Sequence, residues 1–253
     1  MLTATDKPSN SSVASVILGG ADHTDPLASR AGVSAKALVL IRGQAMAGYV
    51  LEALANSRWI SERIYVGSTT PEVRALTTRT LNSGPSLAAS LSIGLNAAVE
   101  LRAERVLVVS ADLPWLTTEA INTFIERSPK AALVYPVIAK EVAERQFPGQ
   151  KRTYAKLKDG AFTGGNLMLL EPRILPTLLP FVNRAYEGRK NPLSLARLLG
   201  FRFALSFLAG RLEIRAMERR IGEVLGMEVR AYRSPDASLG ADVDRLEHLD
   251  SAG

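Results

Sequence analysis

Few residue types in this sequence could carry out chemistry, because its 253 residues include no cysteine and only two histidines. The lack of a thiolate excludes disulfides, iron-sulfur clusters and a cysteine nucleophile, and two histidines are too few for a three-histidine metal site. No Gly-x-Ser-x-Gly motif is present, so the nucleophile elbow of a serine hydrolase is excluded as well. Carboxylates, amides, lysines and backbone groups must therefore carry any reaction.

The first candidate site is Leu18-Gly19-Gly20, with Lys36 sixteen positions after Gly20. Two glycines let the backbone approach a phosphate closely, and a lysine supplies a compact positive charge. A plain structural turn explains the two glycines equally well. A dinucleotide-binding fingerprint is not favoured, because it requires a third glycine that opens a helix and an acidic residue at the end of the second strand.

Carboxylates form the other two candidates. Ser110-Ala111-Asp112-Leu113-Pro114 ends the most apolar run of the chain, and an aspartate at the carboxyl end of a parallel strand can hold a hard cation in the crevice. In Asp242-Val243-Asp244 the two carboxylates are two residues apart, which places them on one side of an extended segment. The alternatives are a helix or turn cap for Asp112 and a solvated turn for the pair.

Short apolar runs that alternate with helical patterns must hold these residues in place. The length and β-branched content of the runs predict strands, whereas apolar side chains spaced three and four residues apart predict helices. This alternation indicates a three-layer α/β fold, in which a mostly parallel sheet carries helices on both faces. The predicted strands are residues 13–18, 63–67, 105–111, 131–137, 166–171 and 227–232, and the predicted helices are 44–56, 86–102 and about 117–127.

The chain is expected to form a single domain over residues 13–250, after a disordered N-terminus at residues 1–12. Residues 140–160 are polar and contain a proline, which favours an excursion over the surface. A basic helical insertion is expected at about residues 184–226. No uncharged apolar run reaches the roughly 18 residues that a transmembrane helix needs.

The segment from Arg184 to Arg220 within this insertion holds the whole of the chain's formal net charge of +6, because it contains nine basic and three acidic residues. Such a segment suggests an anionic partner, although a solvated helix face explains it equally well. The region also has more apolar side chains than one helical stripe can hold, so part of its surface must be covered. We expect intramolecular packing or a homodimer rather than acidic lipid, because Phe201-Arg202-Phe203 interleaves basic and apolar residues.

The candidate residues occur in the order found in the MobA-like nucleotidyltransferases, which the chain resembles over about residues 13 to 250. The wider group has a GT-A-like sheet and includes nucleotidyltransferases for sugar phosphates and isoprenoid precursors. The sequence departs from the usual family pattern in the long spacing between Gly20 and Lys36 and in the length of its basic region. The matching segments are Leu18-Gly19-Gly20, residues 36–46 (KALVLIRGQAM), 84–91 (GPSLAASL), 110–114 (SADLP), 163–166 (TGGN) and 242–244 (DVD).

This resemblance implies a Mg²⁺-dependent enzyme that transfers a nucleoside monophosphate from a nucleoside triphosphate to a phosphorylated small-molecule acceptor and releases pyrophosphate. It gives catalytic roles to Lys36 and Asp112. An acceptor phosphate is already ionised at neutral pH, so no general base is needed. The implied nucleotide-binding residues are Leu18, Gly19, Gly20, Lys36, Gly84, Pro85 and Ser86, the acceptor-binding residues are Gly164, Gly165 and Asn166, and the Mg²⁺ ligands are Asp112, Asp242 and Asp244.

Two other functions fit the same fold. A catalytically silent nucleotide-binding or membrane-surface module is suggested by the long first loop. A nucleotide-sugar-dependent glycosyltransferase would have Asp-x-Asp directly after a central strand, where this chain has Ser110 at the first of those positions. No nucleic acid partner is expected, and the polar start of the chain lacks the apolar core of a secretory signal, which favours a cytoplasmic protein.

Overall fold

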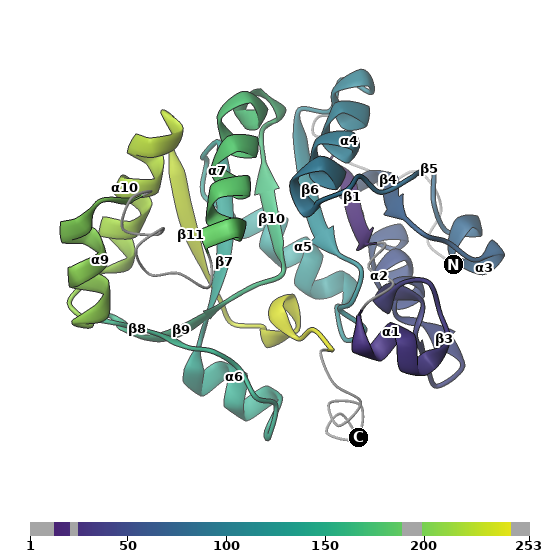
Figure 1. Ribbon diagram of the computed structural model, residues 1–253, viewed down its shortest axis with the longest axis horizontal. Coiled ribbons are helices and arrows are strands. Elements are labelled where there is room, and N and C mark those ends of the chain that lie inside the picture. The colour runs from purple at the N-terminus through teal and green to yellow at the C-terminus, as the bar shows by residue number, and fades with distance from the viewer. Residues whose placement is uncertain (1–12, 21–24, 189–198, 244–253) are drawn as a thin grey trace.

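The computed structural model describes residues 13–20, 25–188 and 199–243, which form one nine-stranded sheet with helices on both faces (Figure 1). The predicted α/β fold with a mostly parallel sheet is therefore confirmed. The expected disordered segment at residues 1–12 lies outside the described residues. In the part of the chain that is described, no helix is both long and apolar enough to cross a bilayer.

The first part of the sheet is built from four parallel strands, β1 (Val13–Gly20), β4 (Ile60–Gly67), β5 (Arg79–Leu81) and β6 (Arg105–Ser110). β1 lies in the middle and pairs with β4 on one side and β6 on the other, and β5 extends the edge beyond β4. β1, β4 and β6 were predicted from their apolar runs, because parallel strands are buried on both faces. β5 has no fully buried residue and gave no such signal.

The rest of the sheet is mixed in direction and contains β7 (Leu133–Ala139), β8 (Ala155–Leu157), β9 (Gly160–Gly164), β10 (Leu167–Leu170) and β11 (Val229–Ser234). β10 lies antiparallel between β6 and β7, and β11 runs parallel to β7. β9 also pairs with β7, so β9 and β10 pair with successive parts of β7. Val137 pairs with Gly164 and Val134 pairs with Leu169. Between these paired positions the β9–β10 segment has four residues and β7 has two, so the segment contains two extra residues.

Side chains that alternate along the strands supply two cores, one on each face of the sheet. On β1, Ile17 enters the first core and Val16 the second, as the two-residue repeat of a strand requires. The first core is completed by α2 (Met46–Ala55) and α5 (Thr118–Arg127), and the second by α4 (Leu87–Glu100) and α7 (Leu175–Gly188).

Short elements fill the connections of the first half, namely α1 (Pro26–Ala31), the 3-10 helix η1 (Lys36–Leu38), β2 (Leu40–Ile41), β3 (Gln44–Ala45) and α3 (Pro71–Ala75). The helix predicted at residues 44–56 begins two residues later than expected. Gln44 and Ala45 instead pair with β2 in a two-stranded hairpin.

The second half adds α6 (Lys140–Gln146), η2 (Pro172–Ile174), α9 (Phe201–Leu208), α10 (Ile214–Leu225) and η3 (Ala237–Gly240). Residues 140–160, expected as a surface excursion, contain α6 and β8, and Ala143 on α6 is buried. The described part of the basic region contains α9 and α10, while residues 189–198 lie outside the described residues.

Candidate functional site

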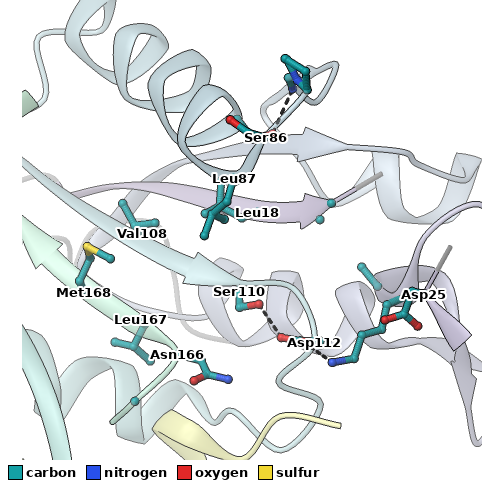
Figure 2. Close-up of a pocket in the computed structure, with 18 of the residues that line it drawn as sticks. Leu18, Asp25, Ser86, Leu87, Val108, Ser110, Asp112, Asn166, Leu167 and Met168 are labelled. Atoms are coloured by element: carbon teal, nitrogen blue, oxygen red, sulfur yellow. Dashed lines mark hydrogen bonds and ion pairs between the residues drawn. The ribbon is translucent and has the colours of Figure 1, made fainter. Parts of the chain in front are cut away.

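A cleft of about 880 Å³ opens beyond the carboxyl ends of β1 and β6 (Figure 2). Parallel strands end at the same edge of a sheet, so the loops that follow them meet there. All seven residues predicted to bind the nucleotide line this cleft, and so do Asp112, Gly165 and Asn166. The structure therefore brings together ten residues that lie up to about 150 positions apart in the sequence.

The glycine loop at the end of β1 presents backbone to the cleft. Gly20 has a φ of 69°, a left-handed conformation that glycine adopts without strain. A Cβ atom on Gly19 would lie 2.0 Å from the hydroxyl oxygen of Tyr65 on β4, so no larger residue fits there. Burial raises the pKa of Tyr65, which keeps this hydroxyl protonated. Tyr65 thus fixes how closely the loop lies against the sheet.

Lys36 and Asp112 meet in the cleft as an ion pair. The Nζ atom of Lys36 lies 2.8 Å from Oδ2 of Asp112, and the two side chains are only 18% and 16% exposed. Ser110 donates its hydroxyl hydrogen to Oδ1 of the same carboxylate (Figure 2). Lys36 and Asp112, 76 positions apart in the sequence, are therefore in direct contact. Both carboxylate oxygens of Asp112 have a partner within the protein.

Asp25 is a cleft residue that the sequence analysis did not select. Its carboxylate accepts hydrogen bonds from the backbone N–H groups of Leu27 at 2.9 Å and Ala28 at 3.0 Å, which caps α1. The signal was present, because Asp25-Pro26 is a typical start of a helix, with the cap residue followed by proline in the first turn. α1 packs against η1, the element that carries Lys36, and Asp25 and Lys36 both line the cleft.

The wall formed by Gly84, Pro85 and Ser86 leads into the N-terminus of α4. Ser86 caps this helix by accepting a hydrogen bond from the N–H of Ala89 at 3.1 Å. The Gly84 N–H donates to the hydroxyl oxygen of Ser90 at 3.0 Å, which folds the loop back onto the first turn of the helix. The loop is thereby held against the cleft chiefly by hydrogen bonds to its backbone.

The opposite wall comes from the break between β9 and β10. Tyr135 donates its hydroxyl hydrogen to the carbonyl of Gly165 at 2.6 Å, and the N–H of Asn166 donates to the carbonyl of Leu239 at 2.8 Å. These bonds anchor the backbone of the break, and the Asn166 side chain lies at the cleft (Figure 2). Gly164 does not line the cleft but packs against the Tyr135 ring. Tyr135 was not selected from the sequence, because β7 carries no motif.

The three carboxylates expected to bind a cation have different positions. Asp112 lines the cleft, and Asp244 lies outside the described residues. Asp242 does not line the cleft, but the next residue, Val243, donates its N–H to the carbonyl of Asp112 at 3.2 Å. Burial raises the pKa of Tyr135 and the Asp242 carboxylate raises it further, so the hydroxyl that donates to Gly165 stays protonated.

The carboxylates of the cleft can be compared with the requirements of Mg²⁺. Within the described ranges, no group of three or more histidine, aspartate or glutamate side chains is arranged to hold a metal. Mg²⁺ is nevertheless commonly held by one or two carboxylates together with substrate phosphates, and it keeps several waters. Asp112 at the end of β6 fits that role, with the remaining ligands supplied by a substrate.

The cleft has a charged end and an apolar end. Asp25 and Asp112 lie at one end, whereas Val108 and Met168 lie at the other (Figure 2). Lys36 belongs to the charged end, because it pairs with Asp112. A ligand that combines an anionic group with a flat, weakly polar group would match both ends.

Comparisons with known proteins agree with this arrangement. Residues 16–200 match the MobA-like NTP transferase domain. A hypothetical transferase from Thermus thermophilus is 41% identical, with a TM-score of 0.83 over 94% of this chain and 99% of that chain. No curated protein matches the chain.

More distant structures share the fold. The 2-C-methyl-D-erythritol 4-phosphate cytidylyltransferase of Thermus thermophilus is 15% identical, with a TM-score of 0.52 over 95% of this chain and 97% of that chain. The CMP:2-keto-3-deoxy-manno-octonic acid synthetase, complexed with CTP, is 13% identical, with a TM-score of 0.54 over 95% of each chain.

Proposed function

The chain belongs to the MobA-like NTP transferase family and is a nucleotidyltransferase, and we propose that it transfers a nucleoside monophosphate to a phosphorylated small molecule. Pyrophosphate is the second product, and the reaction depends on Mg²⁺. A sugar phosphate or another small phosphate ester is the class of acceptor that suits the cleft, because such a molecule brings its own ionised nucleophile.

One observation carries this proposal, namely the Lys36–Asp112 ion pair beside the glycine loop. A lysine and exposed backbone N–H groups favour the phosphates of a triphosphate. In the free protein Asp112 partners the Lys36 ammonium, so the lysine is already held over the place where the phosphates bind. On binding, the ammonium exchanges part of its contact with Asp112 for phosphate oxygens.

The proposed reaction is a single displacement. An anionic oxygen of the acceptor phosphate attacks the α-phosphorus and forms a new P–O bond. The bond from the α-phosphorus to the oxygen that bridges to the β-phosphorus breaks, and pyrophosphate leaves with that electron pair. The protein contributes by aligning the two anionic reactants and by balancing their charge. The Gly19-Gly20 backbone and Lys36 hold the triphosphate, and Asn166 and the Gly165 backbone border the acceptor.

Asp112 would hold Mg²⁺, with Asp242 or Asp244 as further candidates on the adjacent segment. When bound, the ion neutralises negative charge on the phosphate oxygens. Asp112 also orients Lys36 through their ion pair, and Ser110 fixes the orientation of the carboxylate.

Two measurements in sequence test the proposed function. Thermal unfolding with each of the four common nucleoside triphosphates, with and without Mg²⁺, shows whether the cleft binds a nucleotide and which base it prefers. Pyrophosphate release is then followed with the preferred triphosphate and a panel of phosphorylated sugars, alditols and alcohols, with α-labelled triphosphate to detect the joined product. We expect a nucleotide-dependent rise in melting temperature and release that requires an acceptor.

Three outcomes distinguish the three candidate functions. Release that depends on acceptor and Mg²⁺, and that is lost in Asp112→Ala, supports the proposal. Binding of a triphosphate without turnover on any acceptor supports the silent nucleotide-binding module instead. Transfer of sugar from a nucleotide-sugar to an acceptor, without pyrophosphate, identifies a glycosyltransferase. Lys36→Ala should also weaken triphosphate binding. Lys130→Ala is its matched control, because Lys130 is an exposed lysine just before β7 and does not line the cleft.

A further inference from the structure

Helix α9 presents a stripe of large apolar side chains to solvent. Phe201, Leu205 and Leu208 are 65%, 50% and 71% exposed, and their spacing of four and three residues places them on one face of the helix. On the opposite face Phe203 and Phe207 are half-buried against the protein. Of the two expectations for this region, intramolecular packing or a homodimer, the first does not apply to the outer face of α9, which is exposed.

This stripe lies at the periphery of the molecule. α9 sits at the outer edge beside α10, far from the parallel strands that form the cleft (Figure 1). It is attached through Arg220 of α10, whose Nε donates to the carbonyl of Leu199 at 2.5 Å. None of its side chains is fully buried. The helix is therefore held in place while its outer face stays available.

Unpaired positive charge accompanies the apolar stripe. Four exposed arginines on α9, on α10 and in the connection between them form no ion pair with a described residue, namely Arg202, Arg211, Arg215 and Arg219. The three glutamates between residues 199 and 226 are all engaged. Glu213 pairs with Lys158, Glu223 pairs with Arg220, and Glu218 accepts the N–H of Ala231. The exposed surface of α9, α10 and the connection between them thus carries an apolar stripe and four arginines that have no acidic partner among the described residues.

We propose that α9 and its flanking arginines dock this protein on a membrane surface that contains acidic phospholipids. Phe201, Leu205 and Leu208 would enter the boundary between headgroups and acyl chains, and the arginines would bind lipid phosphates. Three apolar side chains alone give weak and reversible attachment, so binding depends on the anionic lipid and weakens with salt. The attachment does not depend on which acceptor the cleft takes.

A second copy of the chain fits this surface less well. An eight-residue helix is about 12 Å long, and its single face covers far less than the roughly 800 Å² that each partner of a stable complex contributes. A twofold contact would also bring the four unpaired arginines toward their own copies, with like charges opposed. Acidic lipid has the opposite charge.

In the sequence alone, the order Phe201-Arg202-Phe203 disfavours lipid binding. In the structure these residues form the first turn of α9 and point in different directions. Successive residues of a helix are about 100° apart, so Phe201 and Phe203 point to nearly opposite sides. Phe203 packs inward, and Phe201 joins the outer stripe with Leu205. Arg202, about 100° from Phe201, lies beside this stripe and is exposed.

Vesicle flotation of the full chain tests the docking. Vesicles of phosphatidylcholine alone are compared with vesicles that also contain phosphatidylglycerol, each at low and high salt, and light scattering gives the oligomeric state of the free protein. We expect flotation only with phosphatidylglycerol, reduced about tenfold or more by high salt. Equal flotation with both vesicles, or none at low salt, overturns the proposal.

Variants show which residues carry the binding. Leu205→Gln combined with Leu208→Gln should abolish flotation, and so should neutralisation of Arg211 and Arg215 to Gln. Val99→Gln with Leu101→Gln removes comparable exposed apolar side chains from the end of α4, and should leave flotation unchanged. Thermal unfolding confirms that each variant folds. A dimer that the Leu205 and Leu208 changes dissociate, with no flotation of wild type, would identify a second copy as the occupant and overturn the lipid proposal.

Discussion

α4 and α9 are both rich in apolar residues, yet the molecule uses them in opposite ways. α4 buries seven of its fourteen residues against the sheet and points its capped N-terminus at the cleft. α9 has eight residues and buries none of them completely. The contrast shows that apolar content alone does not make a core helix. The stripe of α4 faces the sheet and is buried, whereas the stripe of α9 faces outward, where the proposed membrane surface would cover it.

The largest expected effect is on catalytic activity and comes from a change in the cleft beside α4. Asp112→Ala should lower kcat/KM by roughly 10³-fold or more, because the carboxylate positions Lys36 and is the proposed Mg²⁺ ligand. The fold should survive, since the side chain lies in the cleft rather than in a core. Turnover measured beside thermal unfolding checks both statements. Glu223→Ala on α10 is the control carboxylate, and wild-type activity in Asp112→Ala would refute the site.

The contrast in packing can be measured directly by matched leucine truncations. Leu91→Ala on α4 should lower the free energy of unfolding by about 2–5 kcal/mol, because it opens a cavity in the second core. Leu205→Ala on α9 removes the same atoms from a half-exposed position and should cost less than about 1 kcal/mol. Urea unfolding followed by circular dichroism gives both values. Equal losses would mean that α9 is as firmly packed as α4.

The lysine in the cleft and the arginines near α9 should also differ in their effect on triphosphate binding. Lys36→Ala should weaken triphosphate binding by about 10- to 100-fold, the usual value of a hydrogen bond to a charged group. Lys36→Arg should lose less, because it keeps the charge but not the compact ammonium. Arg215→Ala on α10 should leave the affinity unchanged. Titration calorimetry with the preferred triphosphate decides the matter, and unchanged affinity in Lys36→Ala would move the phosphate site elsewhere.

The smallest expected effect concerns the wall formed by β9 and β10. Tyr135→Phe removes one hydrogen bond, from the tyrosine hydroxyl to the Gly165 carbonyl, and should raise the acceptor KM by about 2- to 10-fold. The triphosphate affinity should not change, because the glycine loop does not use Tyr135. Steady-state kinetics with each substrate varied in turn provides the measurement. A loss confined to triphosphate binding would contradict the assignment of this wall to the acceptor.

Much of the parallel part of the fold could be predicted from the sequence. β1, β4 and β6 are buried on both faces and therefore appear as continuous apolar runs, and α4 and α5 show a clear helical repeat. β5, α3 and the β8–β9 hairpin could not be predicted. They are three to five residues long, too short to show a period, so their positions are decided by neighbours distant in sequence.

The site residues that could be predicted are those that occur in a local sequence motif. Gly19, Gly20 and Asp112 directly follow or end buried strands, which is enough to place them at one edge of a sheet. The contact between Lys36 and Asp112 could not be derived, because it depends on how η1 folds back over the β6 end. Tyr135 reaches Gly165 only because β9 and β10 share one side of β7.

The break between β9 and β10 is fixed as tightly as the glycine loop across the cleft. The chain leaves its ladder with β7 at Gly164 and enters its ladder with β6 at Leu167, so Gly165 and Asn166 lie between two ladders. A Cβ atom on Gly165 would lie 2.7 Å from Cγ of Pro136, just as a Cβ atom on Gly19 would lie 2.0 Å from the Tyr65 hydroxyl oxygen. Each wall of the cleft therefore depends on a glycine packed against a neighbouring strand, and a larger residue at either position would displace the backbone that lines the cleft.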